Sequence, residues 1–220
     1  MNKGIALIQV KQYNSAAKEL LEAEKYNPDD PRIYYFLGMA FHRKGMRGKA
    51  IEEFKRAIRL KEDYSEAHNY LGTLYSDMAL WDQAIEEFDK ALANPVYDTP
   101  SKALYNAGWA YYSKKDYKNA LIRYQEALRI EPMTYLRPQI EKNIGVIYYD
   151  INEINEAIEH FEKSVKLDPA LYDAYFLLGE CNLKIQNSKK AKQAFESVIK
   201  LAPKSSSFSQ KAKSYLQSLD

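Results

Sequence analysis

The sequence predicts an all-α solenoid of six helix-turn-helix repeats that ends in a capping helix. Three residue series support this fold class. Glycines recur at spacings of 34, 36, 37 and 34 residues, at Gly38, Gly72, Gly108, Gly145 and Gly179. Twelve residues after each glycine stands an alanine: Ala50, Ala84, Ala120, Ala157 and Ala191. Four residues later stands an aromatic residue: Phe54, Phe88, Tyr124, Phe161 and Phe195. Because the three series drift together, they mark one repeating pair of helices.

Each series has a packing role within the repeat. Glycine and alanine let two antiparallel helices approach closely, and the aromatic ring fills the space beside them. Gly4, Ala16 and Leu20 carry the same register one repeat upstream. Proline ends the second helix because it lacks an N–H and disfavours helix in the residue before it. The prolines at these ends are Pro28, Pro132, Pro169 and Pro203. The predicted repeats, within a single domain 1–220, are 1–30, 31–64, 65–100, 101–137, 138–171 and 172–205.

Two insertions and the chain ends complete the predicted architecture. Extra residues within 94–100 and 133–138 are expected to form loops on one edge or to extend the second helix. Apolar residues recur at helical spacing after the last repeat, which predicts an amphipathic capping helix over 206–220. They are Phe208, Ala212, Tyr215, Leu216 and Leu219. The register opens inside the first helix, so we expect leading sequence to have been removed, with a short natural first helix as the alternative.

Composition argues against several classes of function. The sequence has 32 Lys plus Arg and 30 Asp plus Glu, for a net charge of +2, so nothing favours nucleic acid as a partner. No apolar run approaches the ~18 residues of a membrane span. No basic segment followed by an apolar stretch opens the sequence, so no secretory signal is expected within it. The single cysteine, Cys181, excludes an internal disulfide and a multi-cysteine metal site.

Candidate catalytic and metal-ligating residues are few. All eight glycines belong to the repeats or to one turn, so none remains for a phosphate-binding loop. His42, His68 and His160 lack metal-ligand spacing and are expected to be surface or packing residues. Acidic pairs such as Glu86 and Glu87 are interpreted as solvated helix faces, and Cys181 as a packed thiol. We therefore expect no catalytic residue, no cofactor and no metal.

The repeat residues stand where the signature of the tetratricopeptide-repeat (TPR) family places them, and the chain resembles that family over its whole length. The resemblance implies a right-handed superhelical solenoid that binds a protein or peptide and is not an enzyme. It also implies that the first helix of each repeat lines a concave groove through repeat positions 2, 5, 9 and 12. The predicted groove residues are Tyr35, Met39, His42, Asn69, Tyr105, Trp109, Tyr112, Lys142, Val146, Tyr149 and Phe176.

Two alternatives to this groove stay open. Some of its rings could pack against neighbouring repeats, and the 94–100 insertion could be the main binding site. One specific TPR activity is not expected. The carboxylate clamp of co-chaperone TPR domains needs Lys, Asn and Arg at set positions of successive repeats, and only Lys142 and Asn106 fit, in the wrong order.

A closer resemblance concerns the stretch from Ala93 to Tyr112, which reads AxNPxYxTPxxALxNxGWAYY. With six repeats and the 36-residue spacing, it resembles the PilF/PilW/Tgl family of type IV pilus biogenesis lipoproteins. The resemblance implies assistance to assembly of the pilus secretin, at the periplasmic face of the outer membrane. Membrane association would then require a lipid anchor outside these residues. The alternatives are a generic cytosolic or periplasmic TPR adaptor and a regulatory arm of an enzyme complex.

Overall fold

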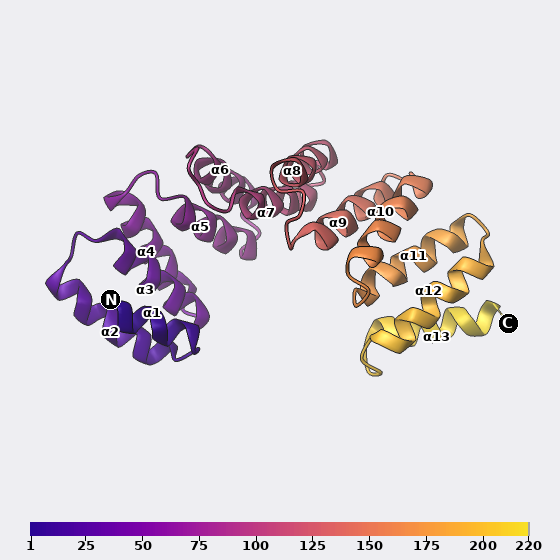
Figure 1. The fold of residues 1–220 in the computed structure, drawn as a ribbon, viewed down its shortest axis with the longest axis horizontal. Helices are drawn as coiled ribbons and strands as arrows, with labels where there is room; N and C mark the ends of the chain where they lie inside the picture. The colour runs from indigo at the N-terminus through magenta and orange to yellow at the C-terminus, as the bar shows by residue number, and fades with distance from the viewer. Residues whose placement is uncertain (220) are drawn as a thin grey trace. The chain divides into compact units, whose positions relative to one another are not determined.

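The computed structural model describes residues 1–219, and within them it contains thirteen α-helices and no strand (Figure 1). Twelve helices follow one another as six helix-turn-helix pairs, and the thirteenth follows them. The helices are α1 (Asn2–Gln9), α2 (Tyr13–Tyr26), α3 (Pro31–Arg43), α4 (Arg47–Leu60), α5 (Ser65–Asp77), α6 (Trp81–Leu92), α7 (Pro100–Ser113), α8 (Tyr117–Ile130), α9 (Arg137–Asp150), α10 (Ile154–Leu167), α11 (Tyr172–Lys184), α12 (Ser188–Leu201) and α13 (Ser207–Leu219). The predicted all-α fold of six helix-turn-helix repeats and a cap is confirmed.

The chain divides into two compact units. The first runs from Met1 to Lys115 and contains α1 to α7, and the second begins at Asp116 and contains α8 to α13. The division falls in the turn between the two helices of the fourth repeat. None of the helices in residues 1–219 is both long enough and apolar enough to cross a bilayer.

Close contact between a glycine and an aromatic ring joins the two helices of the second, third, fifth and sixth repeats, and in the first repeat Gly4 meets Leu20 instead. A Cβ atom added to Gly72 would lie 2.6 Å from Cε1 of Phe88, and one added to Gly179 would lie 2.6 Å from Cε1 of Phe195. Both rings are fully buried. Such a distance is far inside van der Waals contact, so only glycine allows the two helices to come this close. Gly38 and Gly145 meet Phe54 and Phe161 in the same way.

The turn inside every hairpin uses a left-handed backbone conformation. The residues at this position have φ between 56° and 74°: Lys11, Gly45, Ala79, Lys115, Asn152 and Gln186. Glycine adopts this conformation without a steric cost, whereas a residue with a Cβ pays roughly 1 kcal/mol. Only the second repeat has glycine there, so the sequence alone gave no sign of a common turn.

Proline residues open several of the first helices. Pro31 and Pro100 are the first residues of α3 and α7, and Pro138 is the second residue of α9. The first turn of a helix tolerates proline because its N–H would have no partner there. At α3 the carboxylate of Asp30 also accepts a 3.0 Å hydrogen bond from the backbone N–H of Arg32. These prolines therefore mark where a repeat begins, whereas a second set follows the ends of the second helices: Pro28, Pro132, Pro169 and Pro203.

The capping helix covers the apolar side of the last hairpin. In α13, Ala212 is fully buried, and its larger apolar residues pack against a core that includes Phe176 and Phe195. The ring of Tyr215 stacks on that of Phe195, with centroids 4.8 Å apart. This closure supports the predicted role of the cap, since the end of a repeat array would otherwise expose its core.

Candidate partner-binding surface

The most exposed aromatic residue of the predicted groove is Trp109 on α7. Its side chain is 46% exposed, and its ring centroid lies 5.5 Å from that of Tyr112, one turn further along the helix. Tyr105 and Tyr112 are half-buried on the same helix. The other tryptophan, Trp81, packs against the core around Phe88. Trp109 is thus the large apolar side chain that this surface presents to solvent.

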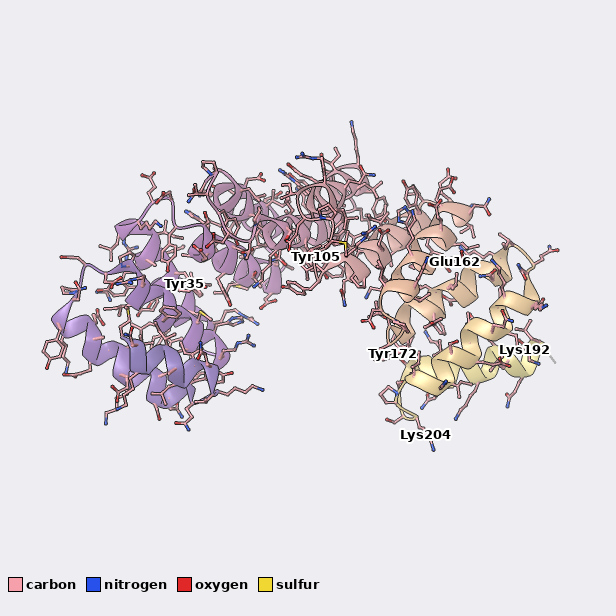
Figure 2. The ribbon with its side chains drawn as sticks, in the orientation of Figure 1. Tyr35, Tyr105, Glu162, Tyr172, Lys192 and Lys204 are labelled. Atoms are coloured by element: carbon pink, nitrogen blue, oxygen red, sulfur yellow. The ribbon has the colours of Figure 1, made fainter. Side chains whose placement is uncertain are left out.

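On α3, the predicted groove residue Tyr35 belongs mainly to an internal aromatic cluster. Its ring lies 5.1 Å from Phe36, 5.2 Å from Tyr64 and 5.6 Å from Tyr70, measured between centroids. Burial raises the pKa of the Tyr35 phenol above its ordinary range. Figure 2 shows Tyr35 on α3 and Tyr105 on α7. Of the rings predicted in repeats 2 and 4, Tyr35 contributes packing and Trp109 contributes accessible surface.

The other two predicted residues of α3 are half-buried. Met39 packs against the core of the first unit. Nε2 of His42 lies 3.8 Å from a carboxylate oxygen of Asp77 at the end of α5. Burial lowers the pKa of His42, against the opposing effect of the Asp77 charge. Near pH 7 this ring is therefore mainly neutral and adds little charge to the surface.

On α5 the structure differs from the sequence prediction at Asn69, which is only 3% exposed. Its side-chain oxygen accepts a 3.0 Å hydrogen bond from the amide of Asn106 on α7. Its backbone carbonyl accepts another from the Thr73 hydroxyl. The neighbouring first helix covers Asn69, so this side chain joins α5 to α7 and is not offered to a partner.

In the second unit, the charged and aromatic residues of the predicted groove already have partners. Nζ of Lys142 lies 2.7 Å from Asp173, which joins α9 to α11. Nζ of Lys184 lies 4.0 Å from the ring centroid of Tyr149, a cation–π contact. Burial raises the pKa of Tyr149. Val146 packs against the core around Phe161. A continuous surface joining these residues to those of α7 stays a prediction.

Phe176 also departs from the prediction, because it is only 4% exposed. Its ring contacts Phe208 and Tyr215 of the capping helix, at centroid distances of 5.3 and 6.1 Å. The cap occupies the first-helix surface at the sixth repeat. Phe176 consequently belongs to the core.

Two of the three histidines form structural pairs with glutamates, each pair within one hairpin. Nδ1 of His68 lies 2.6 Å from Glu87, and Nε2 lies 2.9 Å from the backbone carbonyl of Glu62. Nδ1 of His160 lies 2.8 Å from Glu141. In both pairs the partners are 19 residues apart, with histidine and glutamate exchanged between the first and second helix. Sequence reasoning missed these pairs, although the shared separation could have revealed them.

The first pair corrects the interpretation of Glu87 as part of a solvated face. Its side chain is mostly buried against His68. Burial alone would raise the pKa of Glu87, but hydrogen bonds from His68 and Lys90 outweigh it, so the pKa is lowered. A carboxylate held ionised in this way is a structural anchor and lacks the raised pKa of a general acid.

No other site chemistry emerges in the described residues. No group of three or more His, Cys, Asp or Glu within 1–219 is arranged to hold a metal ion. Burial raises the pKa of the Cys181 thiol to about 12, which keeps it protonated and unreactive near neutral pH. The surface around Trp109 therefore remains the strongest candidate, and its chemistry is that of apolar contact.

Comparison with family models and curated proteins identifies repeats along most of the chain. Models of the "TPR repeat" match residues 4–45 and 145–186. Models of the "Tetratricopeptide repeat" match 31–64, 101–133 and 173–205. The chain is 24% identical over 202 residues to a DnaJ homolog subfamily C member 7 homolog of Dictyostelium discoideum, covering 91% of this chain and 33% of that protein. It is 25% identical to the BBSome complex member BBS4 of Bos taurus, covering 91% and 44%. The chain thus spans less than half the length of these relatives.

Solved structures match nearly the whole chain. PilF of Pseudomonas aeruginosa is 16% identical, with a TM-score of 0.84 over 97% of this chain and 94% of that one. PilW, described as a widely conserved type IV pilus biogenesis factor, is 21% identical, with a TM-score of 0.85 over 96% of both chains. YrrB, described as a TPR protein with an unusual peptide-binding site, is 20% identical, with a TM-score of 0.69 over 90% and 99%. At these identities the likeness is one of fold.

Proposed function

The chain belongs to the tetratricopeptide-repeat family, and from that premise we propose that it is a non-catalytic scaffold. The first helix of each repeat would contribute to the surface that binds a segment of a partner protein. The proposal rests mainly on Trp109, a large apolar side chain that the fold leaves 46% exposed beside Tyr112. Tryptophan and tyrosine are enriched among the residues that dominate binding energy at protein interfaces. The partner segment is expected to cover the Trp109 ring and the accessible edges of Tyr105 and Tyr112.

The size of this ring sets the scale of the expected binding energy. A tryptophan side chain presents about 250 Å² at most, so roughly 100 Å² of Trp109 remains to be buried. At about 25 cal/mol per Å², covering it would contribute about 2.5 kcal/mol. The proposed contact is made by aromatic rings and not by charged side chains. Binding should therefore depend only modestly on salt concentration.

A more specific proposal concerns the partner. The stretch from Ala93 to Tyr112, which contains Tyr105 and Trp109, resembles the pilus biogenesis lipoproteins, and PilF and PilW share this fold along almost the whole chain. On this basis we propose that the chain assists assembly of the type IV pilus secretin. Its place would then be the periplasmic face of the outer membrane. A cytosolic or periplasmic adaptor with another partner is the alternative.

Complementation tests both parts of the proposal. The gene would be deleted in its own host and replaced by the wild type, by Trp109→Ala or by Glu52→Ala, a matched change at an exposed position on the second helix α4. Secretin multimers would be counted on non-dissociating gels, with the level of each variant measured in parallel. The proposal expects Trp109→Ala to lower multimer yield and Glu52→Ala to leave it unchanged.

Two results would argue against it. If the deletion strain formed secretin multimers at the normal level, the proposed role in secretin assembly would be wrong. Multimers restored equally by both variants would keep that role but move the binding surface away from Trp109.

A further inference from the structure

We propose a second binding site in the sixth repeat, a pocket that takes the ring of a tryptophan or tyrosine side chain from a partner protein. The pocket has a volume of about 210 Å³ and lies among α10, α11 and α12. Its walls include Tyr175, Leu178, Asn182 and Ala194. None of these residues belongs to the predicted groove, so the pocket shares no residue with the surface around Trp109.

The sequence explains why a pocket forms at this repeat. In the second to fifth repeats, the residue three positions after the repeat glycine is aromatic: Phe41, Tyr75, Tyr111 and Tyr148; in the first repeat it is Leu7. The residue twelve positions after that one is also large in each: Glu19, Glu53, Glu87, Arg123 and His160. In the sixth repeat these two positions hold Asn182 and Ala194. Both members of the pair are shortened only there.

The fifth repeat shows how the equivalent space is filled in the neighbouring hairpin. There the ring of Tyr148 stacks on that of His160, with centroids 5.4 Å apart and planes at 16°. This stack bridges the first and second helix of the hairpin. The equivalent residues of the sixth repeat cannot form it, because Asn182 and Ala194 have no ring. The pocket therefore takes the place of an aromatic stack.

Asn182 favours a ligand that can donate a hydrogen bond. The side chain is 1% exposed, and its amide group donates a 2.8 Å hydrogen bond to the carbonyl of Leu178. That bond fixes the orientation of the amide. The side-chain oxygen is buried and has no hydrogen-bond partner among the described residues. Because an unpaired buried acceptor costs about 1–3 kcal/mol, a ligand that brings a donor gains more than one that brings only apolar surface.

The rim of the pocket favours an aromatic occupant. Nζ of Lys190 on α12 lies 3.0 Å from a carboxylate oxygen of Glu162 on α10. Glu162 is labelled in Figure 2. Both residues line the pocket and are about half-exposed, so the ammonium of Lys190 can approach the face of an inserted ring. Tryptophan and tyrosine combine a ring with an N–H or O–H donor at its edge. Phenylalanine has the ring without the donor.

Probe binding tests the site directly. N-acetyltryptophanamide, N-acetyltyrosinamide and N-acetylphenylalaninamide would be titrated into the full chain and followed by amide NMR shifts. We expect saturable shifts at residues of α11 and α12 around Asn182 and Ala194 with the first two probes. The phenylalanine probe, which lacks the donor, should bind about tenfold more weakly.

Three variants sharpen the test. Asn182→Tyr combined with Ala194→His rebuilds the stack of the fifth repeat, and we expect it to abolish the shifts. Asn182→Leu keeps a side chain of similar size without an acceptor, and we expect it to remove the preference for tryptophan over phenylalanine. Trp109→Ala should leave the shifts unchanged. Probe binding at the pocket therefore tests this proposal separately from the proposed function.

Several outcomes would overturn the proposal. These are the absence of saturable shifts up to the solubility limit of the probes, equal binding of all three probes, or binding retained by the rebuilt stack. The affinity of free indole would be measured in the same way. If it bound more tightly than N-acetyltryptophanamide, the pocket would be assigned to a small aromatic molecule and not to a protein side chain.

Discussion

Replacing Gly72 by alanine tests the contact on which the hairpins depend. The new Cβ would lie 2.6 Å from Cε1 and 2.8 Å from Cδ1 of Phe88, and 3.1 Å from the backbone carbonyl of Ala84. Carbon atoms prefer separations of about 3.5–4.0 Å, so the ring or the helix must move by roughly 1 Å. Phe88 is fully buried, and close-packed protein interiors leave little space into which a ring can turn. Overpacking of this kind costs about 1–3 kcal/mol.

Helix propensity opposes this cost only in part. Alanine favours a helix over glycine by about 1 kcal/mol. Because a 2.6 Å contact belongs to the upper part of the overpacking range, about 2–3 kcal/mol, the net destabilisation is about 1–2 kcal/mol. For a unit of this size that corresponds to a fall in Tm of roughly 5–10 °C. Tryptophan fluorescence follows the right unit, because Trp81 and Trp109 both lie before Lys115 and Trp81 packs against the core around Phe88.

Gly48→Ala is the matched control. Gly48 lies in α4, and a Cβ there would meet nothing within 4 Å. The same substitution should therefore stabilise the first unit by about 0.5–1 kcal/mol. If Gly72→Ala left Tm unchanged, or raised it as Gly48→Ala should, the close-approach explanation of the repeat glycines would be wrong.

Three further predictions address the turns, the buried carboxylate and the thiol. Ala79 has φ of 56°, so Ala79→Gly should raise the Tm of the first unit, with a gain of at most about 1 kcal/mol; a fall in Tm would contradict the turn geometry. The folded-state pKa of Glu87 is lowered, so the stabilisation that its carboxylate provides is complete above its ordinary pKa of 4.5 and is lost as pH falls through the folded value. Glu87→Gln should therefore reduce the loss of Tm in acid. A variant whose Tm falls in acid as much as that of the wild type would refute this. Raising the pKa of Cys181 from 9.0 to about 12 lowers its thiolate fraction about a thousandfold, so an Ellman assay at pH 8 should show slow reaction in the folded protein and fast reaction in urea; equally fast reaction in both states would contradict the burial.

The sequence was most informative where packing restricts residue identity. The glycine, alanine and aromatic series predicted all six hairpins because a contact such as that of Gly72 with Phe88 tolerates few alternatives. The left-handed turn was not predictable, since residues as different as Lys11 and Ala79 occupy it at a modest energetic cost.

The candidate surface was harder to predict than the fold. Helical spacing identifies which residues share a face, but it does not show what covers that face. Asn69 is covered by α7 through its bond to Asn106, and Phe176 is covered by the capping helix. The pocket at Asn182 was visible in the sequence only as a lapse in an aromatic series, and its meaning required the stack of Tyr148 on His160 for comparison.

The most direct test of the proposed function is the affinity of Trp109→Ala for the periplasmic part of the pilus secretin. Isothermal titration calorimetry would compare it with the wild type and with Glu52→Ala. Truncation of a central aromatic anchor typically costs about 2 kcal/mol or more, so the variant should bind at least about thirtyfold more weakly, while Glu52→Ala binds normally. A wild-type chain that fails to bind the secretin would contradict the choice of partner, and equal affinity of Trp109→Ala and the wild type would contradict the surface itself.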